Sequence, residues 1–272
     1  MKRLVIGTHN GVFHPDEIIA IAMILADTDD VSIIRSRDPK ELEKADILVD
    51  VGGMYDGVKF FDHHQLTEES ELYGLSSAGM VAKSIRYHLS SENRLLIEAV
   101  DKRDTRVNWS KNGKFETFFN SISDCNELDI YSKKQEITFE RLVTLFKRYF
   151  SIEISLGYLQ LSILEIGNEN KKIKSIIMAD RFSNVEKIGM KMNGNIPIYK
   201  HKKLKHVDTR LFENKPYIFI SYDEYQGNYS ISTNTNYCRI VNVSNAIFIH
   251  ANGFFAKTKS IDDLVIDIEE NK

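Results

Sequence analysis

The segment "LVIGTHNGVFHPDEIIAIAMILA", residues 4–26, contains the two elements and the loop that decide the fold. Its first residues are apolar, which predicts a buried strand over residues 3–7. Residues 16–26 are apolar on nearly every face of a helix, which predicts a helix in the interior. A strand that passes through a short polar loop into a helix is the unit from which α/β domains are built.

The segments that follow continue this alternation. We predict strands and helices in the order strand 31–35, strand 45–51, strand 58–61, helix 77–90 and helix 92–103. This order indicates an α/β fold with a mostly parallel sheet in an N-terminal domain, residues 1–112. Residues 113–184 have a helical period and form a connecting segment, whereas short strands separated by Gly, Asn and Pro predict a smaller α+β domain over residues 185–272. We expect a cleft between the two domains.

The composition, with 42% hydrophobic and 28% charged residues, is that of a water-soluble globular protein. No apolar run approaches the roughly 18 residues that a spanning helix requires, so we expect no membrane association. Cys125 and Cys238 are far apart in the sequence, which argues against a disulfide framework and a thiolate zinc site. The first strand begins close to residue 1, so we expect no signal peptide. The scarcity of cysteines predicts a reducing compartment and hence a cytoplasmic location.

Carboxylate and imidazole side chains follow the predicted strands and helices where these end. They are His9, His14 and Asp16 after the first strand, Asp50 after the third, Asp62, His63 and His64 after the fourth, and Asp101 behind helix 92–100. In open α/β sheets, ligands bind beyond the carboxyl ends of the strands. Oxygen and imidazole ligands without thiolate suit Mn²⁺, Mg²⁺, Co²⁺ or iron. The set is larger than one ion needs, which favours a pair of divalent ions.

Several of these residues have a simpler explanation when taken alone. Asp16 could be an acid in the first turn of a helix, Asp50 a turn residue before two glycines, and His9 an ordinary loop histidine. The adjacent pair His63 and His64 has no comparable structural reason beside Asp62. The joint occurrence at several element ends therefore favours a metal site.

Five motifs in the chain also occur together in a known family. They are "IGTHNGVFHPDE", "DILVDVGGMYD", "FDHHQ", "LSSAGMV" and, near the C-terminus, "AIFIHANGF". The chain resembles the DHH phosphoesterase superfamily and, within it, the melanocyte proliferating gene one family, whose members are described as 3′-to-5′ RNA exonucleases. The resemblance spans residues 6 to about 255 and implies a metal-dependent phosphodiesterase acting on RNA or a short oligonucleotide.

The resemblance also implies a two-metal site, with Mn²⁺ favoured and Mg²⁺ or Co²⁺ as alternatives. The implied ligands are His9, His14 and Asp50 for one ion and Asp16, Asp50, His63 and Asp101 for the other, with Asp50 bridging. If the chain is extended here, His64 points away from His63 and toward the scissile phosphate, and Asp62 orients an imidazole. Asp50, Asp62 and His64 are thus the expected catalytic residues.

The C-terminal motif resembles the part of the family that binds substrate. This implies contacts from His250, Asn252 and Gly253, with Lys257 supplying charge where the family has glycines. The net charge is −3, yet "KHKKLKH", residues 200–206, is strongly basic. This stretch could line a groove for a nucleic-acid backbone or be a solvated loop.

Three functions remain open from the sequence. The first is a 3′-to-5′ exoribonuclease or oligonucleotide hydrolase. The second is a small-substrate phosphohydrolase acting on adenosine 3′,5′-bisphosphate (pAp), a cyclic dinucleotide or pyrophosphate. The third is a metal-binding or RNA-binding module without activity, which the clustered acids argue against because their mutual repulsion is costly. The sequence predicts no oligomeric state.

Overall fold

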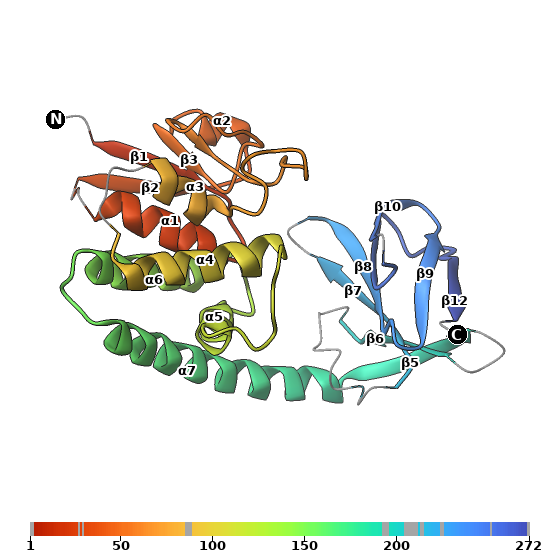
Figure 1. The fold of residues 1–272 in the computed structure, drawn as a ribbon. Helices are drawn as coiled ribbons and strands as arrows, with labels where there is room; N and C mark the ends of the chain where they lie inside the picture. Colours follow the sequence, from red (N-terminus) through yellow and green to blue (C-terminus); the bar gives the residue numbers. More distant parts are fainter. Residues whose placement is uncertain are drawn as a thin grey trace. The chain divides into compact units, whose positions relative to one another are not determined.

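The computed structural model describes residues 3–26, 28, 30–84, 89–191, 196–203, 212, 215–223, 226–250 and 252–270. The chain divides into two compact units, Met1–Lys172 and Ile173–Lys272 (Figure 1).

A four-stranded parallel sheet, of order β2-β1-β3-β4, forms the centre of the first unit. Its strands are β1 (Leu4–Thr8), β2 (Val31–Arg35), β3 (Ile47–Val49) and β4 (Phe60–Phe61). This confirms the predicted parallel sheet, although β3 and β4 are shorter than expected. β4 begins late because Asp56 Oδ1 accepts hydrogen bonds from the amides of residues 58–60, which holds the preceding residues in a turn.

Helices cover both faces of this sheet. The helices of the described chain are α1 (Pro15–Leu25), α2 (Pro39–Leu42), α3 (Ser77–Ser84), α4 (Ser91–Thr105), α5 (Glu116–Asp124), α6 (Lys133–Phe150) and α7 (Leu156–Ser183). As predicted, α1 is buried on nearly all sides, because it contacts α3, α4, α5 and α6 as well as the sheet. α2 lies on the opposite face, where Leu42 packs with Leu48 and Val5 (Figure 1).

The helical segment belongs to the first unit as far as Lys172. Phe119 of α5 and Phe139 and Phe146 of α6 share one hydrophobic core with Ile6 of β1. The segment with the predicted helical period is therefore helical, and its helices α5 and α6 pack on the core of the sheet domain. α7 continues from the first unit into the second.

The second unit is built from strands in its described part after Asn184. They are β5 (Val185–Lys191), β6 (Ile196–His201), β7 (Ile218–Asp223), β8 (Asn228–Thr233), β9 (Cys238–Val243), β10 (Ala246–Ile249), β11 (Phe255–Thr258) and β12 (Ile266–Glu270). A six-stranded sheet has the order β10-β11-β8-β7-β6-β5, and β12 pairs with β9. Ile218, Ile220, Ile231 and Ile240 fill the core between these strands.

Among the described residues, no helix is both long and apolar enough to cross a lipid bilayer.

Candidate metal centre

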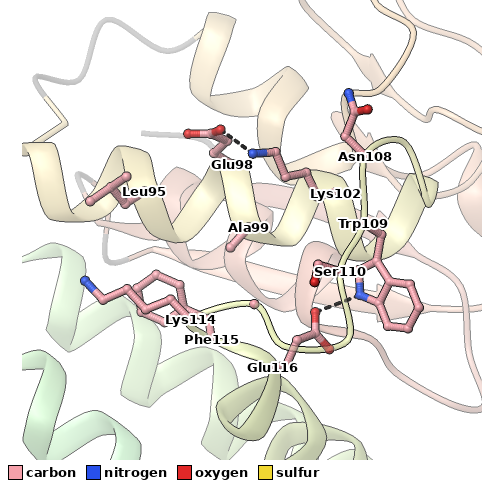
Figure 2. A pocket seen from close by; sticks show the side chains of 11 residues that line it. Leu95, Glu98, Ala99, Lys102, Asn108, Trp109, Ser110, Lys114, Phe115 and Glu116 are labelled. Atoms are coloured by element: carbon pink, nitrogen blue, oxygen red, sulfur yellow. Dashed lines mark hydrogen bonds and ion pairs between the residues drawn. The ribbon is translucent and has the colours of Figure 1, made fainter.

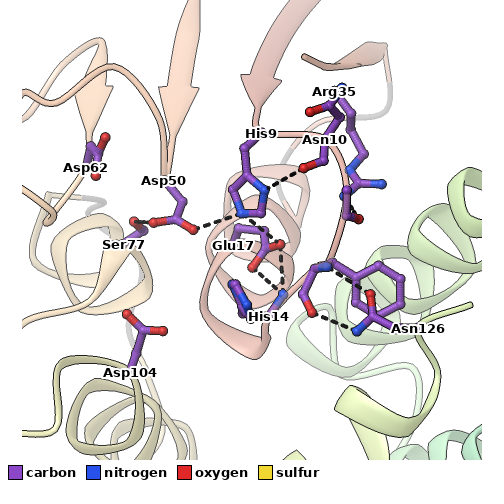
Figure 3. A network of polar contacts seen from close by, with 12 residues as sticks. His9, Asn10, His14, Glu17, Arg35, Asp50, Asp62, Ser77, Asp104 and Asn126 are labelled. Carbon is purple, nitrogen blue, oxygen red and sulfur yellow. Dashed lines mark hydrogen bonds and ion pairs between the residues drawn. The ribbon is translucent and has the colours of Figure 1, made fainter. Parts of the chain in front are cut away.

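Three parallel strands of the first sheet end at the same edge, and each is followed directly by a polar residue. His9 follows β1, Asp50 follows β3 and Asp62 follows β4. Figure 3 shows the three side chains beyond the ends of their strands. All three are almost completely buried, so they face the interior of the site rather than bulk water. The predicted gathering of these residues at one sheet edge is confirmed.

A first group of possible ligands surrounds His9. Its Nε2 atom lies 3.1 Å from Asp50 Oδ2 and 3.4 Å from Glu17 Oε1. His14 precedes the first turn of α1, and its backbone amide donates to both oxygens of Glu17, at 2.9 and 2.8 Å. The possible ligand atoms of His9, His14, Glu17 and Asp50 all lie within 4.8 Å of one another. The sequence therefore predicted three members of this group and missed Glu17.

Asp50 contacts this group and a second one. Its Oδ1 atom accepts a hydrogen bond from the Ser77 hydroxyl at 3.2 Å and lies 3.5 Å from both His63 Nε2 and His64 Nδ1. Burial raises the pKa of Asp50, but the contacts with His63 and His9 outweigh burial and lower this pKa, so the group is anionic. Its φ of 56° is rare for a residue other than glycine and is often found at functional sites. Asp50 thus has the position expected of a bridging ligand.

A third group contains the strongest indication of a cation. Asp16, His63 and Asp104 offer possible ligand atoms within 4.8 Å, and His63 Nε2 lies 2.8 Å from Asp104 Oδ2. Asp16 is completely buried, and in the described part of the chain neither of its carboxylate oxygens has a hydrogen-bond partner. Burial, with the nearby charges of Asp50 and Asp104, raises the pKa of Asp16 well above its usual range. An unpaired buried carboxylate is costly, and a divalent cation would satisfy it. The residues therefore fit a metal.

Asp101 differs from its predicted role. It lies inside α4 rather than behind it, and its Oδ1 atom accepts hydrogen bonds from the Ser76 amide and hydroxyl at 2.9 and 2.7 Å. Burial raises the pKa of Asp101 to about 6. Among the described residues, it belongs to none of the three groups, and Asp104, three residues further along the same helix, does. The sequence signal for Asp104 was its place in the same "DKRD" segment, three residues after Asp101.

The expected orientation of His64 is wrong. Its ring centroid lies 4.5 Å from that of His63, so both imidazoles approach the same side. The reason is that β4 ends at Phe61 and His64 begins a turn, so the chain is not extended there. Asp62 Oδ1 lies 2.7 Å from His64 Nδ1, which raises the pKa of His64 and fixes its ring, as anticipated for Asp62. The side chain of His64 remains 65% exposed.

The predicted substrate-binding residues lie in the second unit, around the β10–β11 turn. His250 Nδ1 accepts a hydrogen bond from the Asn252 amide at 3.1 Å, and its ring centroid lies 4.3 Å from that of Phe254. Gly253 has a φ of 69°, and a Cβ there would approach Arg239 Cβ to 2.6 Å. The close approach to β9 is therefore sufficient to require glycine at this position.

The basic residues of the second unit are partly engaged. Lys257 lies on β11, and its Nζ atom donates to Gln226 Oε1. Lys200 Nζ is 3.5 Å from Glu186 Oε1, which partly neutralises it. Residues 204–206, the remainder of the predicted basic stretch, lie outside the described residues.

Known proteins share parts of this sequence. A MYG1 protein of Saccharomyces cerevisiae is 51% identical over 85 residues, which cover 29% of this chain and 25% of the yeast protein. A MYG1 protein of Chlamydia pneumoniae is 38% identical over 143 residues, 48% of this chain and 45% of that protein. The MYG1 exonuclease of Homo sapiens is 47% identical over 74 residues, 26% of this chain and 20% of that protein. The matched segments thus cover less than half of the length of each relative.

One solved structure and one family model extend the comparison. A pGpG-specific phosphodiesterase, PggH from Vibrio cholerae, has 14% sequence identity and a TM-score of 0.45, over 85% of this chain and 81% of its own. The family model MYG1_exonuc, described as uncharacterised protein family UPF0160, matches residues 5–266. Because this match spans almost the whole sequence, the chain belongs to the MYG1 exonuclease family.

Proposed function

We propose that this protein is a metal-dependent phosphodiesterase that hydrolyses RNA or short oligonucleotides from the 3′ end. The observation that carries the proposal is the completely buried carboxylate of Asp16, which has no hydrogen-bond partner among the described residues and is grouped with His63 and one further acid, Asp104. The name of the human relative, an exonuclease, supports the same class of reaction.

The three groups of possible ligands would hold two divalent ions, with Mn²⁺ favoured. Such a pair supplies a water of lowered pKa and neutralises charge on the phosphate oxygens. In this arrangement Asp50 would contribute to both ions, because it contacts His9 on one side and His63 on the other. Relative to the predicted ligand set, the proposed set gains Glu17 and Asp104 and loses Asp101.

His64 is the residue best suited to act on the substrate itself. It is exposed, its Nδ1 atom is fixed by Asp62, and that contact raises its pKa and favours the protonated ring. A protonated imidazole can donate to a phosphate oxygen or protonate the leaving group. Asp62 acts as a positioning residue, because it also accepts the Gly53 amide at 2.7 Å and is thereby held in place.

A small-substrate phosphohydrolase, acting on pAp, a cyclic dinucleotide or pyrophosphate, is the second candidate. The observation in its favour is a cavity of about 290 Å³ lined by His14, Asp16 and Asp104 among others. This volume is near the lower limit of ordinary small-molecule sites. The two candidates differ in the length of chain that is hydrolysed fastest.

The test is a panel of short RNA, short DNA, pAp and pyrophosphate, each assayed with Mn²⁺ and with Mg²⁺. We expect hydrolysis that requires metal and disappears in Asp50→Asn, a substitution that suits a positive φ. Asp263→Asn is the matched control, because Asp263 is also an aspartate with a positive φ but is exposed in the second unit. Turnover by Asp50→Asn equal to that of the wild type would refute the proposed site. Preference for pAp or pyrophosphate over every oligonucleotide would select the second candidate.

A further inference from the structure

The cavity beside the candidate metal centre is lined by both acidic and basic side chains. Its lining residues are His14, Pro15, Asp16, Val100, Arg103, Asp104, Arg106 and Ser123, and its volume is about 290 Å³. Three of these residues, His14, Asp16 and Asp104, are possible metal ligands. Two others are the arginines at the end of α4, neither of which belongs to the predicted site.

Arg103 is already neutralised. Its guanidinium forms an ion pair with Glu116 and donates to Asn120 Oδ1 at 3.0 Å. The side chains of Arg103 and Glu116 are both largely buried, at 17% and 11% exposure. Arg103 is therefore part of the wall, and its positive charge is balanced within the protein.

Arg106 is held in place without being neutralised. Its guanidinium carbon lies 4.5 Å from the centre of the Trp109 ring, and it forms no ion pair with a described residue. The Trp109 indole donates to Glu116 Oε1 at 2.8 Å (Figure 2), and this hydrogen bond fixes the ring that the Arg106 guanidinium contacts. Stacking on an aromatic ring orients an arginine and leaves its N–H groups able to bind an anion.

The backbone of Arg106 is also unusual. The residue caps α4 with a φ of 63°, a conformation that favours glycine. Backbone strain of this kind is often retained at binding sites. Arg106 thus combines an uncompensated charge, a supported orientation and a strained backbone at the edge of a cavity.

We propose that Arg106 binds a phosphate group of the substrate inside this cavity and selects substrates that place a phosphate there. The identity of the ligand, a phosphate of the substrate, rests on the proposed function. The planar guanidinium of Arg106 suits such a ligand, because its N–H groups match the oxygens of a phosphate. Asp16 and Asp104, which line the same cavity, repel an anion unless cations neutralise them. Phosphate and divalent ion therefore bind together, each strengthening the other.

Trp109 makes this binding measurable, because it is the single tryptophan of the chain and Arg106 stacks on it. Inorganic phosphate and adenosine 5′-monophosphate are titrated into the intact protein with and without Mg²⁺, and Trp109 emission is followed. Isothermal titration calorimetry gives the same affinities independently of Trp109. Adenosine, which lacks phosphate, is the ligand control.

The informative variant is Arg106→Gly, because glycine suits the positive φ and preserves the fold. We expect it to weaken binding of both phosphate ligands by about tenfold to a hundredfold, the effect of losing one charged hydrogen-bonded contact. Arg106→Lys keeps the charge but not the planar fork, and should lose less than Arg106→Gly does. Lys111→Ala, an exposed basic residue of the same loop that does not line the cavity, should bind as the wild type does.

The outcomes separate this inference from the proposed function. Equal affinity in the wild type and Arg106→Gly, or no phosphate binding by the wild type, would overturn the role of Arg106. Phosphate binding that depends on Arg106, in a protein that hydrolyses none of the substrates tested, would uphold the anion site and refute the phosphodiesterase. Hydrolysis that depends on Asp50 but not on Arg106 would uphold the phosphodiesterase and refute the anion site at Arg106.

Discussion

Two carboxylates of α4, three residues apart, have different surroundings. Asp104 lies 2.8 Å from His63 and is partly open, whereas Asp101 is buried and bonded to Ser76. We predict that Asp104→Asn weakens Mn²⁺ binding at least about tenfold, a loss typical of metal-site residues, with little change in stability. Asp101→Asn should keep the metal affinity and lower the stability. Calorimetric Mn²⁺ titration would measure the metal affinity of both variants, and urea unfolding their stability. Loss of Mn²⁺ affinity in Asp101→Asn but not in Asp104→Asn would show that Asp101 is the ligand.

Protonation of the candidate ligands predicts how metal binding depends on pH. Burial lowers the pKa of His63, but its contacts with Asp104 and Asp50 outweigh burial and raise the pKa to about 10. Burial raises the pKa of Asp16. Without metal, both groups hold protons more tightly than usual, and a metal must displace these protons. Mn²⁺ affinity should therefore rise with pH until the pKa of His63, about 10, is reached, with protons released on binding.

The measurement is Mn²⁺ affinity at several pH values, together with the binding heat in buffers of different ionisation enthalpy. His63→Ala is the comparison variant, because it removes one of the protons and should flatten the dependence. An affinity that does not change with pH would show that neither group is a ligand.

At the scale of elements, the contact between α3 and α4 supports the site. Gly79 of α3 packs against Asp101, and a Cβ at Gly79 would lie 2.7 Å from Asp101 Cγ. We predict that Gly79→Ala destabilises the protein by about 1–3 kcal/mol, because it overpacks this contact. Gly157→Ala is the matched control in α7, where the nearest atom would lie 4.0 Å away and where alanine gains up to about 1 kcal/mol of helix propensity.

Urea unfolding of the two alanine variants gives the comparison. If Gly79→Ala had the same free energy of unfolding as Gly157→Ala, α3 could move away from α4 without loss of stability. The contact between Gly79 and Asp101 would then not fix the spacing of the two helices.

At the scale of the whole molecule, the metal groups all lie in the first unit. A ligand that binds only the folded state stabilises it by about 2.7 kcal/mol at a hundredfold excess over Kd. We predict that Mn²⁺ slows amide hydrogen exchange in α1 and β3 and leaves β7 and β8 little changed. Asp50→Asn should abolish the difference. Equal protection of both units would show that the ion binds elsewhere or that the two units unfold together.

The second unit is predicted to affect only longer substrates. If Lys257 contacts a nucleic-acid backbone, Lys257→Ala should reduce the slope of log affinity against log salt by about 0.7 for a single-stranded oligonucleotide. Metal binding and pAp hydrolysis should be unaffected, because a single small phosphate ligand needs few lysines. Lys40→Ala, an exposed lysine of α2, is the control. An unchanged slope would remove Lys257 from the substrate-binding residues.

The sequence by itself determined the parallel sheet, the buried helix α1 and the residues that follow each strand. The strands and the helix follow from the short-range periodicity of apolar residues. In a parallel sheet the carboxyl ends of all strands lie at one edge, independently of how the other elements pack. The positions of His9, Asp50 and Asp62 at that edge therefore follow from the amino-acid pattern alone. The motifs also sufficed to recognise the family that the match over residues 5–266 confirms.

Only the tertiary structure decided which of the candidate site residues that are close in sequence contact one another in the metal centre. Asp101 and Asp104 are three residues apart on one helix, and the packing of α4 against α3 directs one to Ser76 and the other to His63. His64 turns beside His63 because β4 ends early, which no local pattern revealed. α5 and α6 join the first core through contacts far apart in sequence. Long-range packing, rather than local propensity, fixes these features, because a side chain's partners come from other elements.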